Sequence, residues 1–311
     1  MILSVTPNST IDWTLFLPNF RWNETIRSTK TVWGIGGKPA GAAWILGELG
    51  IKTLAIGFMA GVTGEKMLEL MHCKGVETDF IPVQGETRLN VHLVNQENGG
   101  QSTLAVDTLI INQDHVRLFL EKYEAALHNA SAVITGSSLP KCLDLKLFQQ
   151  IISMAHKLSV PIVFDSSGPY LAAGLKANPT IIKPNRAELA SIAGRTVETI
   201  EDAYIAAKEV LQDYGTQVVA TLGEKGALAV LKDCTLHIPS PKVQELESIA
   251  GAGDAVLAGI AYALAFDKPM EEGLRMGFAA AVAVIQTPAT ADCHKEDVEK
   301  LLATIEVIPY Q

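Results

Sequence analysis

The clearest chemical signal in this sequence is a glycine-rich stretch, Gly251-Ala252-Gly253-Asp254, placed directly before an apolar run from Ala255 to Phe266. Glycines let backbone N–H groups converge, and the apolar run predicts a buried helix whose positive dipole end faces them. The stretch therefore predicts an anion-binding site. Asp254 is the only acidic residue in the stretch and the run, and it fits two roles, a helix cap or a general base beside a bound phosphoryl group.

A second candidate, Lys183-Pro184-Asn185-Arg186-Ala187-Glu188, follows the short apolar run at residues 180–182. Asn185 and Glu188 are three residues apart, so on the first turn of a helix they share one face, where their oxygens could hold a hydrated magnesium ion. The same spacing is that of a capping box, and the residues alone leave both roles open. The stretch from Thr221 to Ala227 follows another apolar run and by itself predicts a hairpin with a glycine loop.

A third glycine-rich stretch, Gly34-Ile35-Gly36-Gly37-Lys38-Pro39, matches neither of two familiar phosphate motifs. Pro39 replaces the third glycine of a dinucleotide fingerprint, which argues against a nicotinamide-dependent oxidoreductase. It also replaces the Ser or Thr of a Walker loop, whose first glycine would be Val32. Taken alone, the stretch predicts a turn that leads into a helix.

The elements that position these residues alternate from about residue 130 onward. Ala132 to Ile134 is apolar, Leu145 to Leu158 has helical periodicity, and Val160 to Phe164 is apolar again and is followed by Asp165. The same alternation continues to about residue 231. Such repeated βα units predict a mostly parallel sheet with helices on both faces, and ligands bind beyond the carboxyl ends of its strands.

The first third of the chain shows a different pattern. Short strands are expected at Ile11 to Leu17, Ser28 to Trp33, Leu89 to Asn95 and Gln101 to Val106, the last two joined by a turn at residues 97–100. Helices are expected between them at Ala40 to Leu49 and Gly64 to Lys74. We interpret residues 11–33 and 81–108 as two insertions that form a small β-sheet lid on one α/β domain spanning residues 1–311.

The composition narrows the class of protein. Of 311 residues 48% are hydrophobic, which excludes intrinsic disorder, and 25 Lys and Arg against 34 Asp and Glu give a net charge of -9. Such a chain, without blocks of like charge, is not expected to bind nucleic acid or a membrane. The chain shows no signal-peptide pattern before Pro7, no apolar run long enough to span a bilayer and no C-x-x-C pair among its four cysteines. We therefore expect a cytoplasmic protein.

Five of these features occur in the order used by the ribokinase-like sugar kinases, the PfkB family, which the sequence resembles over nearly its whole length. They are the glycines near residue 36, Asp165, Lys183 to Glu188, Thr221 to Gly226 and Gly251 to Asp254. Within the family the sequence is most similar to the branch of 1-phosphofructokinase and tagatose-6-phosphate kinase. That similarity rests on Thr6-Pro7-Asn8 with Ile11-Asp12, Gly85 to Val91, Ser138-Leu139-Pro140 and Phe164 to Ser167.

The resemblance implies a three-layer α/β/α sandwich with a mostly parallel central sheet and a β-sheet lid that often mediates homodimers. It also implies ATP, Mg²⁺ and phosphoryl transfer to a sugar hydroxyl. The implied catalytic residues are Asp254 as the base and Gly251, Ala252 and Gly253 as the anion hole. Those implied for the nucleotide are Lys183, Asn185, Thr221, Gly223 and Gly226, with Asn185 and Glu188 as the magnesium and phosphate group. Those implied for the sugar phosphate are Asp12, Gly36, Gly37, Lys38, Arg88 and Ser138, the last two facing its phosphate.

The sequence departs from the family pattern where sugar hydroxyls are bound. The family run Gly-Gly-Lys-Gly is followed, one residue on, by a sugar-binding Asn, which is replaced here by Gly41, and His92 stands where a lysine is common. The leading hypothesis is an ATP-dependent kinase of a phosphorylated ketohexose, fructose 1-phosphate or tagatose 6-phosphate. One alternative is a kinase of an unphosphorylated sugar or nucleoside, which Arg88 disfavours because a neutral ligand needs no guanidinium. The other is a non-catalytic sugar-binding regulator, which Asp254 disfavours.

Overall fold

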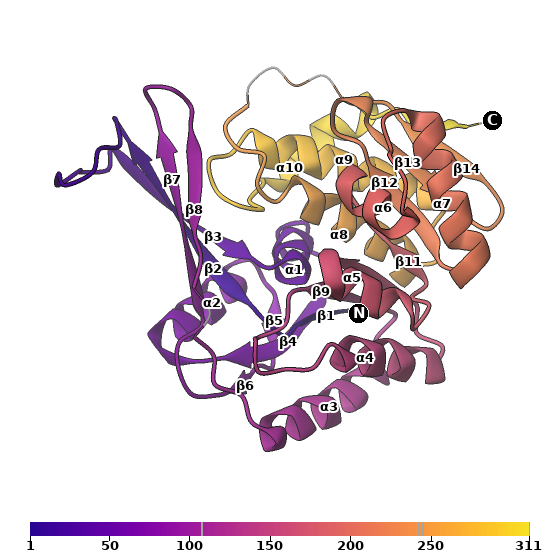
Figure 1. Ribbon diagram of the computed structural model, residues 1–311, viewed down its shortest axis with the longest axis horizontal. Coiled ribbons are helices and arrows are strands. Elements are labelled where there is room, and N and C mark those ends of the chain that lie inside the picture. Colours follow the sequence, from indigo (N-terminus) through magenta and orange to yellow (C-terminus); the bar gives the residue numbers. More distant parts are fainter. Residues whose placement is uncertain (107, 242, 244–245, 311) are drawn as a thin grey trace.

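The computed structural model describes residues 1–106, 108–241, 243 and 246–310 and shows a large sheet enclosed by helices (Figure 1). The sheet has 11 strands among these residues, in the order β15-β14-β13-β12-β11-β10-β9-β1-β4-β5, with β6 paired to β4. Neighbours from β5 to β12 are parallel, and β13, β14 and β15 extend the sheet in antiparallel fashion. The strands are β1 (Ile2–Thr6), β4 (Thr53–Met59), β5 (Glu77–Thr78), β6 (Ile81–Pro82), β9 (Ala132–Ser137), β10 (Ile162–Ser166), β11 (Ile181–Ile182), β12 (Gln217–Thr221), β13 (Ala227–Val230), β14 (Thr235–Ile238) and β15 (Ile308–Pro309).

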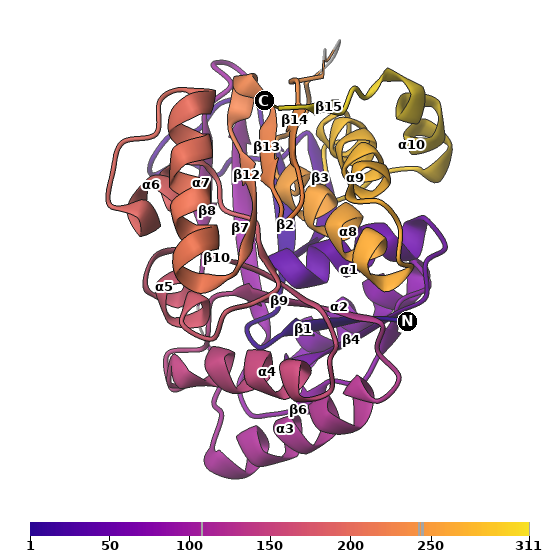
Figure 2. The same ribbon diagram turned by 90° about the vertical axis from the view of Figure 1, so that its right-hand side faces the viewer.

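Helices cover both faces of this sheet, and Figure 2 shows α7 and α8 on its opposite sides. One hydrophobic core contains residues of α1 (Lys38–Glu48), α2 (Gly61–Cys73), α8 (Ala252–Ala265), α9 (Met270–Ile285) and α10 (Lys295–Leu301). The other contains residues of α3 (Gln113–Leu127), α4 (Lys146–Lys157), α5 (Gly168–Leu175), α6 (Arg186–Ala193) and α7 (Ile200–Tyr214). Neighbouring strand residues alternate between the two, as Ile2 and Leu3 do, because successive side chains point to opposite faces. The three-layer α/β/α architecture expected from the sequence is confirmed.

A second sheet of four strands in the described chain stands away from the first (Figure 1). Its order is β3-β2-β7-β8, with β2 and β7 parallel and the other two pairs antiparallel. The strands are β2 (Thr10–Leu17), β3 (Lys30–Gly36), β7 (Arg88–Asn95) and β8 (Gln101–Leu104). Trp13 and Trp33 face each other across β2 and β3 with ring centroids 5.1 Å apart. All four strands expected in this region are present, with shifted ends.

Some expectations need correction. Residues 81–82, expected within the second insertion, pair instead with Phe58 and Met59 as β6 and so extend the main sheet. Residue 107 of that insertion lies outside the described residues. Helix α3 was not expected, although Asn112 and His115 form a capping box at its start. No helix in the described part of the chain is long and apolar enough to cross a membrane.

Candidate active site

The site lies at the carboxyl ends of the parallel strands, and α8 points its N-terminus at it. Gly251 precedes α8 with a φ of 89°, a conformation that side chains rarely adopt, and a Cβ atom there would overlap the backbone of Ala291. Asp254 lies in the first turn, and no side chain caps the helix. The cap role for Asp254 is therefore wrong. Asp254 N donates to the Gly251 carbonyl (3.0 Å), and Ala252 N makes a longer contact with the Ile249 carbonyl (3.4 Å). The N–H group of Gly253 is therefore the donor of this turn best placed for an anion.

The carboxyl group of Asp254 lies at a meeting point of several charged residues. It packs so closely on Gly41 of α1 that a Cβ atom there would overlap it. Burial raises the pKa of Asp254 to about 7, and the negative charge of Asp165 adds to this effect, while Lys183 and Lys38 oppose it. A carboxyl group with such a pKa can accept a proton near neutral pH.

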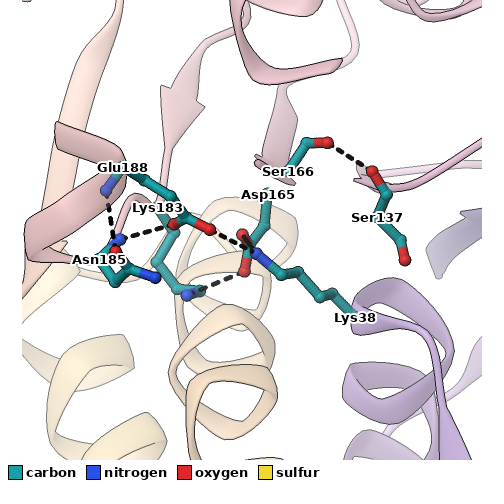
Figure 3. Close-up of polar contacts among 7 residues, drawn as sticks. All are labelled: Lys38, Ser137, Asp165, Ser166, Lys183, Asn185 and Glu188. Carbon is teal, nitrogen blue, oxygen red and sulfur yellow. Dashed lines mark hydrogen bonds and ion pairs between the residues drawn. The ribbon is translucent and has the colours of Figure 1, made fainter. Parts of the chain in front are cut away.

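Asp165, at the end of β10, holds two lysines that come from distant parts of the chain (Figure 3). Its Oδ1 lies 2.6 Å from Lys38 Nζ and its Oδ2 lies 2.8 Å from Lys183 Nζ, and the carboxylate is almost fully buried. Lys38 Nζ also lies 3.3 Å from Glu188 Oε1. Burial disfavours the charge on Lys38, but the attraction and hydrogen bond of Asp165 outweigh it and raise the pKa of Lys38, which stays protonated.

Sequence reasoning gave Asp165 no role, although an acid at the end of an apolar strand is itself a signal. The structure shows that it joins the glycine stretch near residue 36 to the stretch that begins at Lys183. Lys183 also borders the anion site, because a Cβ atom on Gly253 would lie 3.3 Å from its Nζ.

A cavity of about 830 Å³ opens beside the start of α8 and has the size of a pocket for a small molecule or cofactor. Six residues implied for the nucleotide and the anion hole line it: Asn185, Thr221, Gly223, Gly226, Ala252 and Gly253. Its apolar wall, which the sequence did not indicate, comes from Ile249, Val256, Phe278 and Ala281. Lys183 lies beside the cavity, at Gly253, rather than in its wall. Polar loops on one side and apolar residues on the other suit a flat, charged ligand.

Asn185 and Glu188 do form the capping box that their spacing allows. Asn185 Oδ1 accepts a hydrogen bond from Glu188 N (2.9 Å), and Glu188 Oε2 accepts one from Asn185 N (2.8 Å), as Figure 3 shows. Among the described residues, no three His, Cys, Asp or Glu side chains are placed to hold a metal ion together. The capping box uses Asn185 Oδ1 and Glu188 Oε2. Glu188 Oε1 takes no part in it and lies beside Lys38. These residues fit a magnesium ion bound through water and ligand phosphates, which is the usual mode for this ion.

The second sheet contributes Asp12, a buried carboxylate on β2 whose negative charge also acts on Asp254. Asn90 Nδ2 donates a hydrogen bond to its Oδ1 (2.9 Å), and His92 Nε2 lies 3.1 Å from its Oδ2. Gly36 lies so close that a Cβ atom there would overlap the same carboxylate. Asn90 and His92 were not among the expected site residues, although strand alternation places both on the face of β7 that meets Asp12.

Arg88 and Ser138 meet around Asn8, in the loop between β1 and β2. Arg88 Nη1 donates to the Asn8 carbonyl (3.4 Å) and Arg88 Nε to the Val106 carbonyl (3.0 Å). Asn8 Nδ2 donates to Ser138 Oγ (3.0 Å), and Asn8 is almost fully buried. Gly37, at the start of α1, packs against the same loop with a φ of 87°. The two residues implied for a substrate phosphate are thus neighbours, and Asn8 is the link that sequence reasoning missed.

Comparison with known proteins identifies the family of this chain. Residues 4–297 match the family model described as pfkB family carbohydrate kinase. The chain belongs to this family, and it is a kinase that transfers a phosphoryl group to a sugar hydroxyl.

Individual relatives cover almost the whole chain. It is 33% identical to a 1-phosphofructokinase of Haloferax volcanii, over 96% of this chain and 95% of the relative. It is 29% identical to the ATP-dependent 6-phosphofructokinase isozyme 2 of Escherichia coli, over 97% of this chain and 98% of the relative. Among solved structures it is similar to phosphofructokinase-2 from Escherichia coli in complex with fructose-6-phosphate, with a TM-score of 0.85, 28% identity and coverage of 97% and 98%.

Proposed function

We propose that the protein is an ATP-dependent kinase of a sugar phosphate, specifically of a phosphorylated ketohexose. The observation that carries this proposal is the pair Arg88 and Ser138, joined through Asn8 at the edge of the second sheet. A guanidinium and a hydroxyl in this arrangement suit the phosphate already present on the substrate. The names of the relatives support fructose 1-phosphate and fructose 6-phosphate as candidates, and the sequence resemblance adds tagatose 6-phosphate.

In this proposal Asp254 accepts the proton of the attacking sugar hydroxyl, and Asp12 binds another hydroxyl of the sugar. The N–H groups of Gly251 to Gly253 donate to the oxygens of the transferred phosphoryl group, where charge develops during transfer. Lys183, fixed by Asp165, places its positive charge beside Gly253. Gly36, Gly37 and Lys38 form the wall between sugar and nucleotide.

The nucleotide occupies the cavity beside α8, with its base against the apolar wall and its phosphates toward Gly253. Glu188, through water, and the nucleotide phosphates would hold Mg²⁺, which would neutralise charge on the transferred group. Asn185, Thr221 and Gly223 would lie along the nucleotide.

A coupled assay of ADP release tests the proposal. We expect turnover with one of fructose 1-phosphate, fructose 6-phosphate or tagatose 6-phosphate and little with fructose, ribose or adenosine. Arg88→Ala should raise KM for that sugar phosphate about 10- to 100-fold, because a charge-assisted contact contributes about 1.5–3 kcal/mol, and should leave KM for ATP unchanged. A preference for an unphosphorylated sugar would favour the alternative kinase. Binding without turnover would favour a regulator.

We also propose that the second sheet acts as a lid and pairs with a second copy of the chain. Trp22 is 82% exposed and Leu104 is 58% exposed, both on this sheet or its connecting loop. Exposed large apolar side chains in one region are typical of interaction surfaces. Sedimentation equilibrium should show a dimer that Trp22→Glu with Leu104→Glu converts to a monomer, and a monomeric parent protein would contradict the proposal.

A further inference from the structure

The turn that leads into β7 is fastened to the first turn of α2, at the base of the second sheet (Figure 1). The residue before α2 is Ala60, which has no side chain that can cap the helix. Glu86 supplies the cap from elsewhere: its Oε2 accepts hydrogen bonds from Thr63 N (3.2 Å) and from the Thr63 hydroxyl (2.7 Å). A carboxylate at a helix N-terminus interacts favourably with the dipole. The hydrogen bonds from Thr63, and a further one from Val62, hold the pKa of Glu86 below its usual value.

Thr87 binds the same helix turn. Its N–H donates to the Ala60 carbonyl (2.9 Å), and its hydroxyl accepts from Ala60 N (2.9 Å). The Thr63 hydroxyl, already close to Glu86, also lies 2.7 Å from the Thr87 carbonyl and shares its single hydrogen between the two. Gly61 has a φ of 62°, and a Cβ atom there would overlap the Glu86 carboxylate. With glycine at position 61, the start of α2 therefore has the backbone conformation and the space that the contact with the Glu86 carboxylate needs.

Arg88 is the next residue after this turn, so the conformation of the turn fixes the position of the Arg88 backbone. Across the turn, the Thr108 hydroxyl donates to the Glu86 carbonyl (2.7 Å), and the Thr10 hydroxyl donates to the Arg88 carbonyl (3.0 Å). Glu86 itself is exposed, and its carboxylate is engaged with α2 rather than directed at Asp254. The carboxylate is linked to Arg88 through the Thr63 hydroxyl and the backbone of Thr87, the residue directly before Arg88.

We propose that Glu86 is a positioning residue: by capping α2 it fixes the turn before β7 and so holds the Arg88 guanidinium toward the phosphate of the substrate. The proposal rests on the phosphate-binding role proposed above for Arg88. It makes α2 part of substrate recognition, although this helix contributes no residue to the cavity beside α8.

The test uses the full-length enzyme and whichever of fructose 1-phosphate, fructose 6-phosphate and tagatose 6-phosphate gives the highest kcat/KM. Glu86→Ala should raise KM for this sugar phosphate about five- to tenfold, which corresponds to about 1–1.4 kcal/mol, with KM for ATP unchanged. Glu86→Gln keeps an acceptor for the Thr63 groups and should recover most of this loss. Thr199→Ala is the matched control, because it removes the side-chain cap of α7, far from the second sheet. It should lower Tm without changing either KM.

A double substitution separates the two proposals. If Glu86 acts through Arg88, Glu86→Ala should not raise KM further in an Arg88→Ala background. An unchanged KM in Glu86→Ala, an equal change in Thr199→Ala, or a full additional effect in the Arg88→Ala background would each overturn the positioning role while leaving the phosphate contact intact. An Arg88→Ala enzyme with normal KM for the sugar phosphate would overturn the phosphate contact, and the positioning role would fall with it.

Discussion

A carboxylate that takes a proton in the transition state cannot be replaced by an amide of the same shape. Asp254→Asn should therefore lower kcat about 10²- to 10⁴-fold, the usual contribution of a positioned general base. ATP binding should persist, because the cavity walls and the N–H groups of α8 are unchanged. Measurement of kcat together with ATP affinity by calorimetry checks this, with the parent protein as the control. A variant with near-normal kcat would show that another group accepts the proton.

The raised pKa of Asp254 predicts a pH dependence of activity. Only the ionised carboxylate can accept a proton, so kcat/KM should rise as pH increases through about 7 and level off above it. Ionisation of Lys38 should not add a second change to the pH profile of kcat/KM in this range, because the pKa of Lys38 is raised above its ordinary value. A profile of kcat/KM from pH 5.5 to 9, restricted to conditions in which the fold persists, tests this. A flat profile between pH 6 and 8 would mean that the carboxyl group is already ionised in the free enzyme.

Among the elements, the start of α8 contains two glycines with different functions, Gly251 at the N-cap and Gly253 in the first turn. Gly251→Ala forces a side chain into a backbone conformation with positive φ and against Ala291, so we expect a loss of about 1–3 kcal/mol in the free energy of unfolding together with lost activity. Gly253→Ala meets only the end of the Lys183 side chain in its surroundings. It should keep nearly the parent Tm and lose activity.

Denaturant unfolding, thermal unfolding and kcat, measured on both variants, separate these effects. The two substitutions add the same methyl group two residues apart, so each serves as a control for the other. Equal Tm values for the two variants would show that the contact between Gly251 and Ala291 does not fix the loop.

For the whole molecule, the second sheet should become more protected when substrate binds. All of β8 is exposed and β7 is half-buried, whereas the middle of β12 is fully buried, so the second sheet should open locally at lower free energy. If the second sheet closes over the bound sugar phosphate, the substrate would be enclosed between the second sheet and the main sheet, and water would be excluded from the site. In hydrogen exchange, the sugar phosphate should slow exchange in β2 and β7 more than in β12. Unchanged exchange with saturating ligand would mean that this sheet is a fixed part of the scaffold.

Much of the architecture follows from local patterns in the sequence. The alternation of apolar runs and amphipathic segments after residue 130 predicts a parallel sheet with two helical layers. Strands that are apolar along their whole length are stable only when helices cover both faces of the sheet. The hairpin at residues 97–100 follows from its glycines, and it joins β7 to β8 in the structure. Very short strands such as β5, β6 and β15 leave no periodic signal, so only their pairing partners define them.

From the sequence alone, glycines and single polar residues at strand ends and helix starts also indicated candidate site residues, because they have few structural uses there, but Asn8, Asn90 and a role for Asp165 were missed. The sequence left Asp254 and the pair Asn185 and Glu188 with two roles each. Only the tertiary structure showed that Asp254 does not cap α8 and that Asn185 and Glu188 do cap α6. It alone placed Lys38 and Lys183 on Asp165, because these contacts join residues that are more than a hundred positions apart or that lie at the ends of neighbouring strands. A pKa depends on burial and on neighbouring charges in space, so the proton affinity of Asp254 was decided by the fold and not by the sequence around it.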